Sequence, residues 1–206
     1  MSSYSFRPLG RNDFPALRGW LSQAHVARWW ADDASAEGVE ADYGGVIDGT
    51  EPAEVFIAHR DGSGIGLAQR LRLADYPHYL RDIEAIVPVP AQSWSIDFLV
   101  GDPAHTGLGW GTEMIAAFTT RLWSDYAPAR SIVVPVHGSN RASWRALERA
   151  GYARIAAGLM EPDNPADHRN HFVYRVDRPA RQSGTAPGAG QGLTMDPSND
   201  RRAPCS

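Results

Sequence analysis

Two adjacent stretches, WSIDFLV at Trp94–Val100 and GLGWGT at Gly107–Thr112, decide the fold. The first is an apolar run with the length of a buried strand, and it carries one carboxylate, Asp97. The second is rich in glycine and is followed, through Trp123, by apolar residues at helical spacing. Strand, glycine loop and helix therefore come in that order, which predicts an α/β domain.

The flanking sequence predicts further strands and helices on both sides of this block. The expected strands are residues 4–8, 55–58, 65–73, 132–136, 152–159 and 171–176, and the expected helices are 13–24, an irregular one within 31–49, and 140–150. Asp75–Gln92 holds three prolines and is expected to be a surface loop that carries specificity. Residues 1–178 are predicted to be one domain, and 179–206, with little apolar content, a disordered tail.

The composition narrows the possible partners. The chain has 206 residues, a formal net charge of −4 and no basic run, which argues against nucleic acid. No apolar run approaches the roughly 20 residues of a membrane span, and the N-terminus lacks a secretory pattern, so we expect a cytoplasmic protein with no membrane partner. The single cysteine, Cys205, excludes an internal disulfide, and the histidines lack metal-site spacing, so no metal is predicted.

The glycine loop has two possible interpretations. Glycines that enter a helix N-terminus leave main-chain N–H groups free to bind the oxygens of a pyrophosphate. Taken alone, the run is a weak signal, and an ordinary strand-to-helix turn is the better interpretation of it until the flanking sequence is considered. A dinucleotide-binding fold is excluded because its glycine turn lies in the first βα unit, whereas this run follows a hairpin.

Thr106–Gly111 resembles the acetyl-coenzyme A motif Gln/Arg-x-x-Gly-x-Gly/Ala of the GCN5-related N-acetyltransferase (GNAT) superfamily, with Thr106 replacing the usual Gln or Arg. Ser139–Tyr152 resembles a second motif of that family, the helix Asn-x-x-(Ala/Ser)-x-x-x-Tyr-x-x-x-Gly-Phe, and the spacing from Asn140 to Gly151 matches. The resemblance implies a single mixed, mostly antiparallel sheet flanked by helices, with acetyl-CoA as co-substrate. It also implies a set of coenzyme-binding residues: Leu99, Val100, Thr106, Gly107, Leu108, Gly109, Trp110, Gly111, Thr112, Asn140 and Ser143.

Two positions of the second motif, Asn140 and Leu147, bear on the chemistry. By resemblance Asn140 binds the pantetheine arm of the coenzyme, although Asn is also a good helix N-cap, and both roles are compatible. Leu147 stands where many members of the family have a tyrosine thought to protonate the departing thiolate. A tyrosine general acid at that position is therefore excluded.

Within the superfamily the chain most resembles aminoglycoside 6'-N-acetyltransferases, which act on a primary amine. The matching segments are Trp29-Trp30, Ile96-Asp97-Phe98 and Val100-Gly101-Asp102-Pro103. The resemblance implies that Asp97 is the catalytic base or the anchor of the acceptor ammonium, the alternative being a structural carboxylate satisfied by neighbouring donors. Transfer is expected to be direct, with main-chain N–H groups near Leu99 or Val100 stabilising the oxyanion.

The same resemblance suggests residues that bind the acceptor. Trp30 would form an aromatic wall, and Trp29 is a second candidate for it, although we expect Trp29 to be the core tryptophan of the pair. Carboxylates and tyrosines of the 75–92 loop, and carboxylates in the connection before the last strand, would complement a polycation. For the loop residues, a merely solvated loop face is the alternative. The predicted substrate-binding set is Trp30, Tyr79, Asp82, Asp97 and Asp163.

Three functions remain open. The first is acetyl transfer to the 6'-amine of an aminoglycoside, although Val134-Pro135-Val136-His137 lacks the Asp-Pro pair of several resistance enzymes. The second is a siderophore-pathway or other small polyamine or lysine-type N-acyltransferase, a branch that usually has His where Asp97 stands. The third is a coenzyme A-binding module without turnover. The sequence leaves the choice between monomer and homodimer open.

Overall fold

The computed structural model describes residues 2–162, 164 and 167–180, so Asp163 and the predicted tail from residue 181 onward lie outside the described residues. A seven-stranded sheet runs in the order β1-β2-β3-β4-β5-β7-β6. Neighbouring strands are antiparallel except β4 and β5, which confirms the predicted mixed, mostly antiparallel sheet. The strands are β1 (Tyr4–Pro8), β2 (Glu54–Arg60), β3 (Ser63–Arg72), β4 (Ser93–Val100), β5 (Ser131–His137), β6 (Ala153–Leu159) and β7 (Asn170–Asp177).

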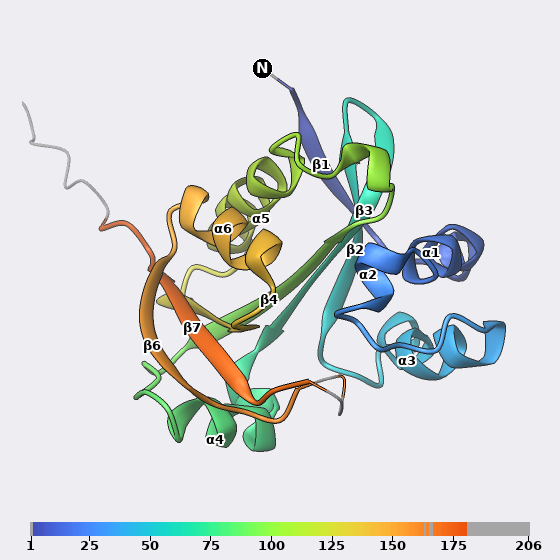
Figure 1. Ribbon diagram of the computed structural model, residues 1–206. Helices are drawn as coiled ribbons and strands as arrows, with labels where there is room; N and C mark the ends of the chain where they lie inside the picture. The colour runs from blue at the N-terminus through green and yellow to red at the C-terminus, as the bar shows by residue number, and fades with distance from the viewer. Residues whose placement is uncertain (1, 163, 165–166, 181–206) are drawn as a thin grey trace, which may run out of the picture.

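Helices cover both faces of the sheet. They are α1 (Phe14–Leu21), α2 (Ala24–Ala27), α3 (Ala36–Asp48), α4 (Pro77–Glu84), α5 (Trp110–Asp125) and α6 (Arg141–Arg149), with short 3₁₀ turns at Arg11–Asp13, Leu73–Asp75 and Pro103–His105. In Figure 1, α5 and α6 lie together on one side of the sheet, and α1, α2 and α3 lie on the other. Among the described residues, no helix is long and apolar enough to cross a membrane.

The buried side chains form one cluster under α5 and α6 and two clusters on the opposite face. Of those two, one joins Leu17 of α1 and Val39 of α3 to Leu67 and Leu99 of the sheet. The other packs α4, through its fully buried Ile83, against the second half of the sheet. The helices on this face therefore form two groups, each with its own apolar contacts, and the candidate site lies between them.

Local sequence signals account for most of these elements. The predicted hairpin is confirmed as β2 and β3, and the predicted glycine loop and helix as α5 and the turn before it. The helix expected to be irregular within residues 31–49 is the regular helix α3. The Ser35 side chain stabilises its start, because Oγ accepts from the Gly38 N–H at 2.9 Å. It ends at Gly49, whose φ of 73° suits glycine. The first helix ends at Leu21, earlier than predicted, and α2 follows as a separate turn.

The predicted loop Asp75–Gln92 is wrong in its first half, which contains α4. Pro77 is the first residue of this helix, where no intrahelical acceptor exists for an N–H, so the proline costs nothing and favours helical φ. The other two prolines of the segment follow the last helical residue, Glu84. Burial of Ile83 then holds the helix on the sheet.

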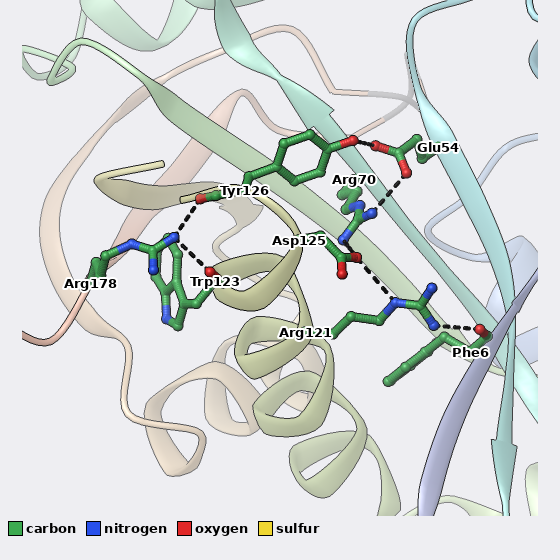
Figure 2. A network of polar contacts seen from close by, with 8 residues as sticks. All are labelled: Phe6, Glu54, Arg70, Arg121, Trp123, Asp125, Tyr126 and Arg178. Atoms are coloured by element: carbon green, nitrogen blue, oxygen red, sulfur yellow. Dashed lines mark hydrogen bonds and ion pairs between the residues drawn. The ribbon is translucent and has the colours of Figure 1, made fainter. Parts of the chain in front are cut away.

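A polar network fixes α5 to the sheet (Figure 2). Arg70 of β3 is only 3% exposed, and it donates to Asp125 and to Glu54, both at 2.8 Å. Tyr126 donates to the other oxygen of Glu54. At the end of α5, Arg178 donates to the carbonyl oxygens of Trp123 and Tyr126, as shown at the left of Figure 2. A cation at a helix C-terminus satisfies carbonyl groups that lack intrahelical donors and opposes the helix dipole.

Candidate functional site

The parallel strands β4 and β5 pair only at their beginnings. Their register contains two pairs, Ser93 with Ser131 and Trp94 with Ile132, and none further along the strands. Gly101 donates its N–H to Ile65 at the end of the β3–β4 ladder. Hydrogen-bonded and non-bonded residue pairs alternate along an antiparallel ladder. Since Gly101 is bonded to β3, the odd-numbered residues of β4 direct their N–H groups to β3. The even-numbered residues direct theirs to the other side, into the split where β4 and β5 are no longer paired.

This alternation separates two of the predicted coenzyme contacts. The N–H of Val100 faces the split, and its carbonyl oxygen accepts from Nε2 of His25 in α2 at 2.8 Å. The N–H of Leu99 is directed to its partner Leu67 in β3. Of the two donors proposed for an oxyanion, the ladder therefore favours Val100 over Leu99.

The glycine loop ends next to the split. Gly107 and Gly109 have φ of 75° and 86°, a region that strains other residues, and Gly109 is the N-cap of α5. The first N–H groups of this 16-residue helix have no intrahelical acceptors and carry the positive end of its dipole. Leu108 is exposed. Thr106 donates its hydroxyl to Pro103 at 2.8 Å, so this side chain stabilises the preceding turn, and the donors available to a ligand belong to the main chain.

The start of α6 borders the same region. Asn140 is 9% exposed, and its Oδ1 accepts from the Ser143 N–H at 3.1 Å, which confirms the N-cap. The bond uses the oxygen of the amide, so its NH₂ group is still a donor. Asn140 and Ser143 both line the cavity described next. Leu147 is fully buried, as its apolar side chain requires.

A cavity of about 630 Å³ lies over the sheet between α3 and α4 and reaches the start of α6. Asp97 in β4 and its register partner Gln69 in β3 form part of its floor. Of the predicted residues, Trp30, Tyr79, Asp97, Asn140 and Ser143 line it, although they come from four separate segments. Among the described lining residues there is no Arg, but there are five carboxylates: Asp32, Asp42, Asp97, Glu161 and Asp167.

The acidic residues influence one another through buried Tyr43. The hydroxyl of Tyr43 donates to Asp32 at 2.8 Å. Burial raises the pKa of Tyr43 far above its ordinary value, and the negative charges of Asp32, Asp42 and Asp97 raise it further. Burial, followed by the charge of Asp33, also raises the pKa of Asp42. Three carboxylates therefore act on one phenol, and their charges give this part of the cavity a negative potential.

Asp167 behaves differently because it is paired. Arg28 donates to both of its oxygens, at 2.6 and 2.7 Å, and this bonding lowers the pKa of Asp167. The pair connects the segment after α2 with the connection between β6 and β7. The sequence did not single out Arg28, and its contact with Asp167 spans 139 residues, so no local pattern indicates it.

Both tryptophans of the pair line the cavity. Trp30 also packs against the apolar cluster of α1 and α3. Trp29 has the Arg28 guanidinium 4.3 Å from its ring centroid and the His137 ring at 5.6 Å. The prediction that Trp29 is the core tryptophan is therefore wrong: Trp30 makes the core contact, and the ring of Trp29 is held by a cation and an imidazole.

Two predicted substrate residues are not part of the cavity as described. Asp163 lies outside the described residues. Asp82 is exposed on α4 and is absent from the lining, whereas Tyr79 on the same helix lines it. Helical geometry explains the difference, because α4 buries Ile83 against the sheet and the neighbouring position is then turned to solvent.

We expect Asp82→Asn to change kcat/KM for a cationic acceptor by less than about twofold, since exposed charges contribute little to binding. Steady-state kinetics at low and high salt measures this. A loss of about tenfold that disappears in salt would instead show that Asp82 attracts the acceptor over a distance.

Comparison with known proteins places this geometry in a family. The family model described as acetyltransferase (GNAT) domain matches residues 10–159. That range is most of the chain and contains the glycine loop, the split and α6. The chain therefore belongs to the GNAT family of acetyltransferases.

Two relatives narrow the likeness. The aminoglycoside N(6')-acetyltransferases type 1 of Klebsiella pneumoniae and of Serratia marcescens are each 26% identical over 167 residues, which is 80% of this chain and 80% of each relative. The solved structure of AAC(6')-Ib with paromomycin and acetyl-CoA has a TM-score of 0.72 at 22% identity, over 89% of this chain and 99% of that one. AAC(6')-Ib with coenzyme A and kanamycin gives a TM-score of 0.71 at 22% identity, covering 85% and 95%. The protein is an N-acetyltransferase that resembles aminoglycoside 6'-N-acetyltransferases.

Proposed function

We propose that the protein transfers the acetyl group of acetyl-CoA to the 6'-amine of an aminoglycoside. The observation that carries this proposal is the cavity beside the β4–β5 split. Five carboxylates line it, and no Arg is among its described lining residues. An aminoglycoside carries several ammonium groups on a rigid sugar framework. Carboxylates in a cavity bind such groups through charge-assisted hydrogen bonds and repel anionic acceptors.

The coenzyme would bind along the split and the start of α5. The main-chain N–H groups from Gly107 to Thr112 suit its pyrophosphate, because they combine free donors with the positive end of the helix dipole. The N–H of Val100 and the side-chain amide of Asn140 are donors for the pantetheine arm and the thioester. Because these donors are mostly main-chain groups, the substitution of Thr106 for Gln or Arg in the motif does not remove them.

The acceptor would enter from the acidic cavity. Asp97 holds the ammonium group near the thioester, and Trp30 and Tyr79 provide aromatic surface for the sugar ring. After it loses a proton, the amine nitrogen attacks the thioester carbonyl, and a C–N bond forms. The C–S bond then breaks and its electron pair leaves on the sulfur, so that the products are the acetamide and coenzyme A.

The proposal is tested by thiol release from acetyl-CoA with matched acceptors. Neomycin and paromomycin differ at the 6' position, where paromomycin has a hydroxyl group in place of the amine. We expect turnover of neomycin and kanamycin and a kcat/KM for paromomycin that is lower by at least about 10³-fold, since a hydroxyl is a far weaker nucleophile.

Spermidine and Nα-blocked lysine complete the panel. Faster turnover of spermidine or blocked lysine than of any aminoglycoside would move the assignment to a small polyamine or lysine-type acceptor. Equal turnover of neomycin and paromomycin would show that the acceptor nitrogen is not the 6'-amine. Coenzyme binding without turnover of any amine would leave only the non-catalytic binding module.

A further inference from the structure

One imidazole is held in a single orientation in the acidic cavity, which we call the acceptor cavity because the proposed acceptor binds there. His171 lies near the start of β7, opposite His137 at the end of β5, and is 9% exposed. It lines the acceptor cavity and also a second cavity of about 440 Å³ at the ends of β5, β6 and β7. The two cavities therefore meet at this side chain and at His137.

The hydrogen bonds of His171 define its tautomer. Its Nδ1 lies 2.9 Å from the carbonyl oxygen of Arg169. A carbonyl oxygen can only accept, so Nδ1 carries the hydrogen of the neutral ring. The lone pair is then on Nε2, the nitrogen that a base would use.

His137 is bonded in the opposite way. Its Nδ1 accepts from the Ser139 N–H at 3.2 Å, and its Nε2 donates to the His168 carbonyl oxygen at 2.6 Å. Both ring nitrogens are therefore engaged by the main chain in the neutral form. Although the two rings contact each other at 5.4 Å, only His171 has a nitrogen that can accept a proton without breaking a main-chain bond.

The reaction requires such a group. An acceptor ammonium must lose a proton before its nitrogen can attack, and a carboxylic acid, with an ordinary pKa near about 4, takes that proton poorly at neutral pH. Imidazole ordinarily titrates near neutral pH and is the commonest general base. A carboxylate that anchors the ammonium and an imidazole that deprotonates it are thus complementary parts.

We propose that Nε2 of His171 accepts the proton of the acceptor ammonium that Asp97 holds. This inference rests on the proposed function, because it concerns the same acceptor cavity. The N–H bond of the ammonium breaks, its electron pair stays on nitrogen and attacks the thioester carbonyl, and the proton moves to Nε2. The surplus proton on the nitrogen of the tetrahedral adduct passes to the departing thiolate, and His171 returns its proton to water, so one proton is released in each turnover.

Charged and titratable groups surround His171 on several elements. Glu161 and Asp167 face the same cavity from the β6–β7 connection, and Arg169 is paired with Glu161 at 2.9 Å. The other charged or titratable groups on this side are His137 on β5, His168 before β7, Asp97 on β4, Tyr76 and Tyr79 on α4, and Arg28 after α2, which is paired with Asp167 at 2.6 Å.

The kinetic test compares His171→Gln with His137→Gln over a pH range. We expect His171→Gln to lower kcat/KM for the accepted aminoglycoside by about 10²-fold at neutral pH, the usual contribution of general base catalysis. The deficit should shrink towards about pH 9.5, where more of the amine has already lost its proton. His137→Gln should keep the pH dependence of the wild type. A merely structural role of His171 would lower the rate by the same factor at every pH, and that result would overturn the proposal.

A second measurement does not depend on activity or on the folding of a variant. ¹⁵N NMR of histidine-labelled wild-type protein in alkaline solution, where imidazoles are neutral, should show His171 with its hydrogen on Nδ1 and none on Nε2. A hydrogen on Nε2 would overturn the role of His171 even if the protein acetylates aminoglycosides. If the wild type acetylates no amine at all, the proposed function fails and this inference fails with it, whereas an active wild type with a pH-independent deficit in His171→Gln removes the inference alone.

Discussion

Asp97→Asn should lower kcat/KM for a cationic acceptor by about 10³-fold, because loss of a half-buried charge partner costs about 4 kcal/mol when an ammonium is left without it. The change keeps the size of the side chain and removes only its charge. Asp32 and Asp42 remain in the cavity, so the acceptor still experiences a negative potential, but no anion is left in β4 beside the split. Thiol release measured over a range of acceptor concentrations gives the ratio.

The coenzyme affinity supplies the matched readout. Because the donors proposed for acetyl-CoA are main-chain groups and Asn140, its Kd by calorimetry should be the same in Asp97→Asn as in the wild type. Asp177→Asn, at the end of β7, is a control for the loss of one negative charge, since this exposed carboxylate bonds only to Arg175 among the contacts described. An Asp97→Asn variant with kcat/KM within threefold of the wild type would make Asp97 a structural carboxylate.

The strand, glycine loop and helix could be predicted because their signals are local. Met114 and Phe118 recur at helical spacing, and Gly107 and Gly109 adopt the positive φ that makes glycine necessary. Helix α4 could not be predicted in the same way. Its proline occupies the first helical position and its single fully buried residue, Ile83, depends on a sheet surface that only the tertiary fold supplies.

The acidic cavity was predicted in part, because only Asp97 interrupts an apolar strand and so attracts notice in the sequence. Asp32 follows the tryptophan pair in an irregular segment, and Asp42 lies on α3 among other polar residues. Neither has a local pattern that separates it from an ordinary surface carboxylate. They come together with Asp97 only in the fold, where all three carboxylates act on the buried phenol of Tyr43 and Asp97 comes from a strand far away in the sequence.

The orientation of a side chain is a further property that the sequence leaves open. Trp29 and Trp30 are identical in type and adjacent, so composition cannot decide which of them packs on α1 and α3. His137 and His171 are likewise equivalent in the sequence. The main-chain groups around each ring differ, and those groups alone determine which imidazole has a nitrogen for proton transfer.

Arg70→Met should lower the free energy of unfolding by about 3 kcal/mol, at the lower end of the cost of breaking a buried ion pair. The loss of stability lies at the lower end because the two carboxylate partners, Glu54 and Asp125, are 33% and 35% exposed, so water can replace part of the lost bonding. The guanidinium also lies 4.8 Å from the ring centroid of Tyr126, a contact that methionine replaces only in part. Thermal unfolding should show Tm lower by about 6–12 °C for a protein of this size.

Arg72→Met is the matched control, since this arginine is on the same strand, pairs with Asp75 and is 54% exposed in its side chain. Its loss should cost less than about 1 kcal/mol.

The deficit of Arg70→Met should also depend on pH. Burial opposes ionisation of Asp125, but the bonds from Arg70 and Arg121 outweigh it and hold the pKa of this carboxyl below its usual range. A lowered pKa stabilises the fold above about pH 4 and loses that effect as the pH falls through the folded-state value, so the gap between Arg70→Met and the wild type should narrow in acid. A gap that stays constant in acid would assign the stabilisation to the aromatic contacts of Arg70 instead of to its ion pairs.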